Sequence, residues 1–248
     1  MIITITGIAF SISSIGLAFC GIRFFKAFQK MGGLQSGSQL GILLSILFIG
    51  FSFQHGILAI GGLFFAQISE ALYAILVIDH IVLTFVTALA VYLAFYILLP
   101  KISPWPVTIG VLALGFFGTA LTIFGHPQPF IDANNSIDWN MERPAELSIY
   151  YLLLFSLAAP FLIFVKNFFQ TFSRDVKTVS FILALTHFLG LVNVSILFSG
   201  LLDGKDSLRT NAFDKVLGVI GILFVIGFLI IPIVNGWVLK GTNNKIAQ

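Results

Sequence analysis

The sequence predicts an all-α integral membrane protein, a bundle of seven transmembrane helices. Of the 248 residues 58% are hydrophobic and only 9% are charged, whereas a soluble domain carries roughly 25% charged residues. The apolar residues form runs long enough for helices that cross a bilayer, which takes roughly 20 residues each. These runs show no alternation and exceed the roughly 10 residues of a β-barrel strand. Together the observations exclude a soluble globule and a disordered chain.

We expect one domain over residues 1–248, with polar or turn-forming segments between the spans. The spans are predicted at about 2–23, 40–66, 71–99, 106–125, 147–167, 178–202 and 213–239. The break between the second and third spans is the shortest, since only Gln67, Ser69 and Glu70 interrupt two apolar runs. The longest loop, about 126–146, is either a solvated connector or a partly ordered cap.

Basic residues predict the orientation of the bundle. Most of them follow the first, third and fifth spans or lie in the tail: Arg23, Lys26, Lys30, Lys101, Lys166, Arg174, Lys177, Lys240 and Lys245. The opposite side has Arg143, Lys205, Arg209 and Lys215. By the positive-inside rule we expect the N-terminus outside and the C-terminus in the cytoplasm, in a bacterial cytoplasmic membrane or its equivalent.

Charge and cysteine content limit the partners. The net charge of +3 is what basic cytoplasmic loops supply, so it does not indicate nucleic-acid binding. The single cysteine, Cys20, excludes a disulfide framework and a multi-cysteine metal site. The expected partners are therefore the lipid bilayer and other subunits of a membrane complex.

Few polar side chains lie at membrane depth, and these are the candidate site, because buried ionisable groups in membranes are costly and usually functional. They are Gln54, His55, Asp79, His80, His187 and Asn193. At about 1.5 Å per residue, His55 and His80 are predicted at similar depth, on the order of 15 Å from the outer boundary, with His187 about 6 Å deeper. Asp79 is the only acid there, so it needs a partner or a proton.

Helical spacing places polar side chains on two stripes that should face protein or a cavity. Tyr73, His80, Thr84 and Thr87 form the first stripe, and Ser45, Ser52, His55 and Gly62 form the second. Asp79 lies about 100° around the helix from His80. Each histidine is either a satisfied core residue or part of a functional site.

Three functions fit these residues. The first is a redox protein or accessory subunit that binds haem b or a transition metal through His55, His80 or His187, with His55 and His80 as the metal pair. The second is a proton-coupled transporter or channel centred on Asp79, with Gln54, Tyr73, Thr84 and Asn193 in the relay or ligand pocket. The third is a seven-helix sensor or interaction subunit that would co-purify with a signalling partner.

Retinal and zinc-protease chemistry do not fit. A retinal protein needs a lysine in the middle of the seventh span, whereas Lys215 and Lys240 stand at its two ends. The HExxH zinc motif is absent from the sequence, and so is the Gly-x-Ser-x-Gly turn of the serine hydrolases. The sequence alone therefore does not indicate whether the protein is an enzyme.

Overall fold

A computed structural model describes residues 3–30, 36–133, 135–172 and 174–202. Within them, six helices are long and apolar enough to cross a membrane, which indicates a lipid bilayer environment. The helices are α1 (Ile5–Lys30), α2 (Ser36–Ile60) with the short π-helix η1 (Gly61–Phe65), α3 (Ser69–Leu98), α4 (Trp105–Gly125), α5 (Arg143–Gln170) and α6 (Arg174–Leu202). Helices long and apolar enough to cross a membrane occupy the first six predicted spans. The predicted seventh, 213–239, lies outside the described residues.

The helix boundaries follow local sequence signals. Ile68 is extended, with φ of −116°, and separates η1 from α3. Pro104 precedes α4 and Pro106 lies in its first turn, where the missing proline N–H costs no helical hydrogen bond. At the other end His126 takes a left-handed conformation with φ of 41°, which ends the helix.

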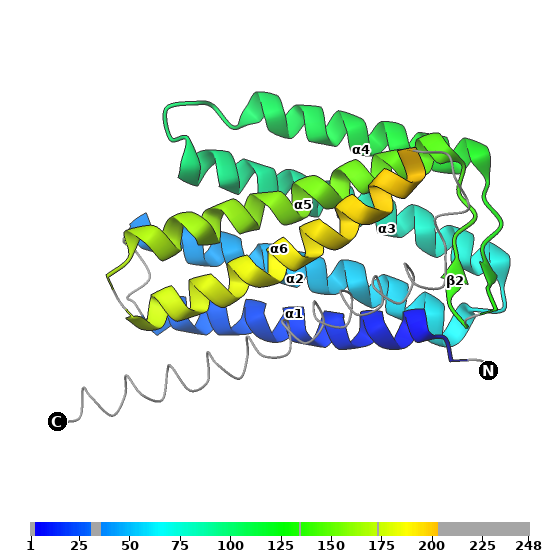
Figure 1. Ribbon diagram of the computed structural model, residues 1–248, viewed down its shortest axis with the longest axis horizontal. Helices are drawn as coiled ribbons and strands as arrows, with labels where there is room; N and C mark the ends of the chain where they lie inside the picture. Colours follow the sequence, from blue (N-terminus) through cyan, green and yellow to red (C-terminus); the bar gives the residue numbers. More distant parts are fainter. Residues whose placement is uncertain (1–2, 31–35, 134, 173, 203–248) are drawn as a thin grey trace.

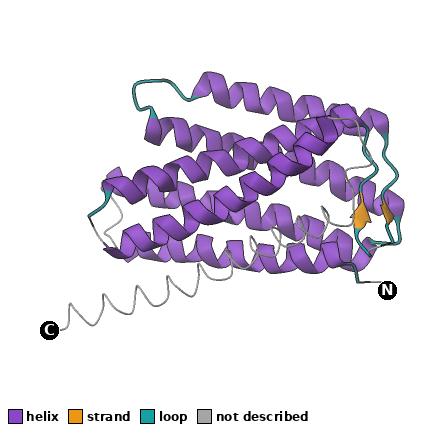
Figure 2. Cartoon of the chain, in the orientation of Figure 1, coloured by secondary structure: helices purple, strands orange, loops and turns teal. Residues whose placement is uncertain are grey.

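The helices lie side by side as a bundle, with almost all of the described chain in helix (Figure 1, Figure 2). α1 packs along α2 and α5 packs along α6, while α3 contacts α2, α4 and α5. The position of α3 explains why Asp79, His80, Thr84 and Thr87 are all buried. α3 is therefore the central helix of the described bundle.

Helix association in a membrane relies on close packing and hydrogen bonds, because lipid tails are as apolar as leucine side chains. Between α1 and α2 the hydroxyl of Ser14 donates to the carbonyl of Ser52, and the hydroxyl of Ser52 donates to the carbonyl of Ser14, both at 2.8 Å. About two turns away, Ser45 donates to the carbonyl of Gly21 at 2.7 Å. Small side chains thus bring these two backbones together.

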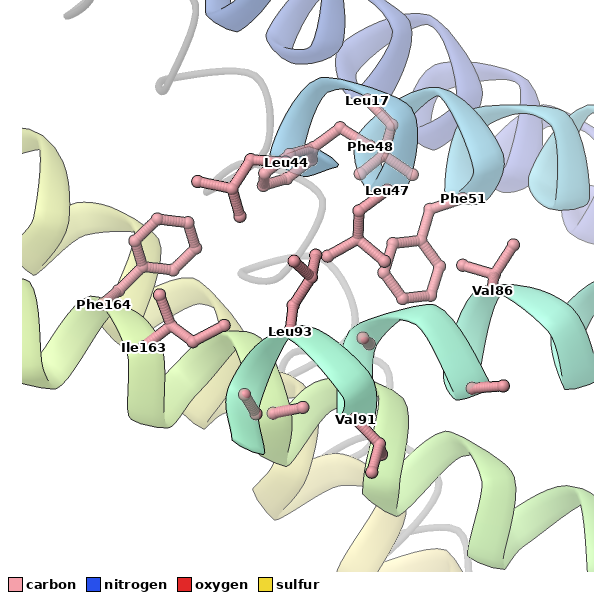
Figure 3. Packing of buried hydrophobic residues seen from close by; sticks show 14 of the residues in the cluster. Leu17, Leu44, Leu47, Phe48, Phe51, Val86, Val91, Leu93, Ile163 and Phe164 are labelled. Atoms are coloured by element: carbon pink, nitrogen blue, oxygen red, sulfur yellow. The ribbon is translucent and has the colours of Figure 1, made fainter. Parts of the chain in front are cut away.

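An apolar cluster fills the centre between α2, α3 and α5. Figure 3 shows side chains from the three helices directed toward one another. The labelled members are Leu17 from α1, Leu44, Leu47, Phe48 and Phe51 from α2, Val86, Val91 and Leu93 from α3, and Ile163 and Phe164 from α5. This cluster lies toward the end of the bundle at which α3 ends and α4 begins.

Residues 126–133 and 135–142 form a cap at the opposite end. Two short antiparallel strands, β1 (Phe130–Ile131) and β2 (Ile137–Asp138), pair in it. The loop contacts the start of α1, because Asn135 donates to the carbonyl of Ile3 at 2.9 Å and the N–H of Ile137 donates to the hydroxyl of Thr6 at 3.0 Å. These bonds show that the loop forms a cap and is not merely a solvated connector.

Candidate functional site

Asp79, an acid buried within α3, contacts Gln54 of the neighbouring helix. Nε2 of Gln54 donates to Oδ1 of Asp79 at 2.7 Å. Both side chains are 4% exposed. Asp79 lies about 15 Å along α3 from its start at Ser69. The pair is therefore buried between α2 and α3, well inside the end of α3.

The same pair leaves one polar atom unsatisfied. Among the residues that the structure describes, Oε1 of Gln54 is fully buried and has no hydrogen-bond partner. Leaving a buried acceptor unpaired costs on the order of 1–3 kcal/mol. An amide oxygen accepts hydrogen bonds but cannot donate one. The site thus lacks one hydrogen-bond donor.

His80 lies on another side of α3, at a junction with α4 and α5. Its side chain is fully buried. Nδ1 lies 3.2 Å from the hydroxyl of Thr122 on α4, and Nε2 lies 3.4 Å from the hydroxyl of Ser148 on α5. His80 and Asp79 are adjacent in sequence, so the 100° turn per residue directs them to different neighbours.

The two hydroxyls at His80 already donate elsewhere. Thr122 donates to the carbonyl of Gly118 at 3.0 Å, and Ser148 donates to the carbonyl of Ala145 at 2.7 Å. A hydroxyl has one hydrogen, so both oxygens face His80 as acceptors. A neutral ring donates from one nitrogen only, to either Thr122 or Ser148. The arrangement suits a ring that donates from one or both nitrogens.

A glycine on α4 makes this junction possible. A methyl group at Gly118 would overlap the Ser148 side chain and would lie 2.8 Å from Nε2 of His80. One turn earlier, a methyl group at Gly115 would overlap Thr84. The polar stripes of the sequence did not include Thr122 and Ser148 as partners of His80. The Gly115-x-x-Gly118 spacing was the available signal, since small residues mark close helix contacts in membranes.

The other two membrane-depth histidines contact their own helices and aromatic rings. Nδ1 of His55 lies 2.9 Å from the carbonyl of Phe51, and Nδ1 of His187 lies 2.8 Å from the carbonyl of Leu183. The ring of His55 meets Phe10 of α1 edge-on at 5.3 Å between centroids. The ring of His187 lies 6.3 Å from that of Phe48 and 5.8 Å from that of Phe164. Each histidine thus occupies a different interface.

The remaining predicted site residues are distributed along the bundle. Thr84 is buried and donates to the carbonyl of His80 at 2.8 Å. Tyr73 donates to the carbonyl of Ile123 at 3.4 Å, near the capped end. Asn193 lies on α6, and its Oδ1 is buried without a partner among the described residues. The structure therefore joins Gln54 with Asp79 and Thr84 with His80, whereas Tyr73 and Asn193 have other surroundings.

No group of three or more His, Cys, Asp or Glu side chains that could hold a metal ion occurs in the described part of the chain. A carbonyl oxygen only accepts, so Nδ1 of His55 and of His187 must carry the hydrogen. In a neutral ring Nε2 then keeps the lone pair and is the nitrogen that can bind iron or another metal. At His80 both ring nitrogens lie beside hydroxyl groups, which fits proton exchange better than ligation.

Comparison with known proteins identifies no relative of this chain. No protein-family model, curated protein or solved structure matches this chain.

Proposed function

We propose that the protein is a proton-coupled membrane carrier in which Asp79 binds and releases the proton. The observation that supports this function is the buried Gln54–Asp79 pair with its unsatisfied amide oxygen. A protonated Asp79 can donate its O–H to Oε1 of Gln54 while Nε2 of Gln54 donates to Oδ1. This two-bond acid–amide pair supplies the missing donor and removes the cost of a buried charge.

Proton release would leave a carboxylate between two apolar helices. An uncompensated charge at membrane depth costs at least about 2.5 kcal/mol, so the bundle has to open toward water or admit a cation when the proton leaves. The pair therefore couples the protonation state to conformation or to a bound solute, which is the requirement for a proton-coupled carrier.

An infrared measurement tests proton binding directly. The full-length protein is reconstituted in liposomes, and the carboxylic-acid carbonyl band is compared between acidic and alkaline buffer. We expect a band from a buried protonated acid that disappears in Asp79→Asn and persists in Glu70→Gln, a control acid at the exposed end of α3. If the band is the same in Asp79→Asn, Asp79 does not hold the proton.

A flux measurement tests the carrier. Liposomes that enclose a pH-sensitive dye are given a pH gradient with potassium and valinomycin to balance charge. We expect proton entry above that of empty liposomes, its loss in Asp79→Asn and partial retention in Asp79→Glu. Flux that survives Asp79→Asn refutes the carrier role of this residue, even if the infrared band is present.

The second candidate is a haem b or metal site. Its support is the orientation of His55 and His187, whose Nδ1 atoms are held by backbone carbonyls, as in many ligating histidines. The aromatic rings of Phe10, Phe48 and Phe164 provide the apolar surroundings that haem prefers. An absorbance spectrum with metal analysis tests this role. A Soret band lost in His55→Ala or His187→Ala supports it, and a colourless, metal-free protein contradicts it.

We further infer seven crossings with the N-terminus outside. Arg23, Lys101 and Lys166 lie near the same end of the bundle, at the end of α1, between α3 and α4, and toward the end of α5. Glu70 and the 126–146 cap lie at the other end (Figure 1). The separation agrees with the positive-inside rule.

Cysteine labelling tests this topology. Single cysteines are introduced at Ser103, Ala133 and Asn243 in a Cys20→Ser background, and intact cells are treated with a membrane-impermeant maleimide. We expect labelling at position 133 only, because the other two positions would be cytoplasmic. Labelling at position 103 instead of 133 would reverse the orientation, and labelling at both 133 and 243 would exclude an odd number of crossings.

A further inference from the structure

An apolar groove opens between α5 and α6. The cavity has a volume of about 270 Å³ and is lined only by hydrophobic side chains, five of them phenylalanines. Phe161 and Phe188 mark one end, and Phe169 and Phe181 mark the other. Eight residues of α5 correspond to a length of about 12 Å, which is close to the roughly 15 Å occupied by one leaflet of acyl chains.

The groove is separate from the polar sites described above. Within the described bundle it remains open, since Phe169 is 75% exposed and Phe181 is 52% exposed. Leu185 lies in its wall and is 44% exposed. An aromatic-lined depression at the surface of a membrane helix pair fits a flexible hydrocarbon chain, and its length matches the lipid leaflet that surrounds this part of the bundle.

Among the described residues, two cations, Lys177 and Arg174, lie at one end of this groove. The ammonium group of Lys177 lies 5.9 Å from the ring centroid of Phe168, which is one of the lining residues. Arg174 is exposed one turn earlier on α6. On the facing helix, Lys166 is already engaged, because it donates to the carbonyl of Ile97. The two α6 cations lie about 6 Å and 10 Å beyond Phe181 along the helix, at the level where lipid headgroups begin.

We propose that this groove binds an anionic phospholipid, with one acyl chain between α5 and α6 and the phosphate beside Lys177 and Arg174. Basic residues at the membrane end of helices attract anionic headgroups, and each is worth about a fivefold gain in binding. The apolar wall selects for a hydrocarbon chain, and the cations select for a negative headgroup. This inference does not depend on the proton-carrier proposal.

Native mass spectrometry of the full-length protein in detergent tests the binding. The protein is titrated with dioleoyl phosphatidylglycerol and, separately, with dioleoyl phosphatidylcholine. We expect tighter binding of phosphatidylglycerol, a loss of about fivefold of that preference in Lys177→Gln, and loss of most bound lipid of both kinds in Leu185→Trp, which fills the groove. Equal binding of the two lipids to the wild-type protein overturns the headgroup assignment.

Two control variants match these changes. Lys101→Gln removes a cation outside α5 and α6, and Leu162→Trp enlarges an exposed α5 side chain that is not part of the groove wall. Both should bind lipid as the wild-type protein does. If Leu185→Trp also binds lipid like the wild type, the groove is not the site. In membranes, a disulfide between Leu185→Cys and a cysteine placed in 213–239 would show that the chain itself fills the groove, and would overturn the proposal.

Discussion

The junction of α3, α4 and α5 gives a sharp test of the packing, because α4 contains two glycines in opposite surroundings. A Cβ atom added at Gly118 would lie 2.5 Å from Cβ of Ser148 and 2.8 Å from Nε2 of His80, where ordinary contacts are 3.4–4 Å. A Cβ atom added at Gly110 would meet nothing within 4 Å. Gly118→Ala and Gly110→Ala therefore make the same chemical change in the same helix, but only the methyl group at position 118 collides with its neighbours.

The expected changes in the free energy of unfolding have two contributions, helix propensity and packing. Alanine is favoured over glycine in a helix by about 1 kcal/mol at either position. Overpacking a tight interface costs about 1–3 kcal/mol, and only Gly118 incurs this cost. We expect Gly110→Ala to raise the free energy of unfolding by about 1 kcal/mol, and Gly118→Ala to fall below Gly110→Ala by about 1–3 kcal/mol.

The assay is reversible unfolding in mixed micelles of increasing sodium dodecyl sulfate content, followed by circular dichroism. Adding Ser148→Gly to Gly118→Ala should recover part of the loss, because it removes the side chain that the new methyl group strikes. If Gly118→Ala and Gly110→Ala agree within about 0.5 kcal/mol, α4 does not approach α3 and α5 as described, and the contacts assigned to His80 are wrong.

Further predictions concern the ends and the core of the bundle. Thr4→Val should lower the free energy of unfolding by about 1 kcal/mol, because the hydroxyl of Thr4 accepts from the N–H of Gly7 and donates to the carbonyl of Gly62; an unchanged unfolding curve would contradict these bonds. Cys20 is fully buried and should react with a maleimide only after unfolding, so rapid labelling of the native protein would exclude its packed position. Glu70→Gln should change stability by less than about 1 kcal/mol, since its ion pair with His126 spans 3.6 Å between exposed side chains; a larger change, measured in the same assay, would show that this pair anchors the cap.

The π-helical segment η1 is bonded to the start of α1. The carbonyl of Gly62 accepts bonds from the N–H and the hydroxyl of Thr4, at 3.3 Å and 2.8 Å. Gly62 also lies against the backbone of Gly7, where any side chain would collide. The start of α1 is thus fixed to the end of α2 beneath the cap.

The helical membrane fold could be predicted from the sequence, because six apolar runs of sufficient length can satisfy their backbone groups in lipid only as helices. The sequence also predicted that Asp79 needs a partner, because the cost of a buried acid does not depend on which helix is its neighbour. The span ends differ from the prediction by a few residues, since helices continue into the polar interface, as α5 does from Arg143.

Which polar groups are in contact depends on the tertiary structure. Counting residues along each span placed His55 and His80 at the same depth. The side chains that touch are instead those of the preceding residues in the sequence, Gln54 and Asp79. Successive side chains point 100° apart around a helix, so which side chains touch depends on the order of the helices in the bundle and on how each is turned about its axis. A sequence of similar apolar runs does not specify that arrangement. The partners of His80, Thr122 and Ser148, come from helices 42 and 68 residues away, and it is the close approach permitted by Gly118 that brings them together.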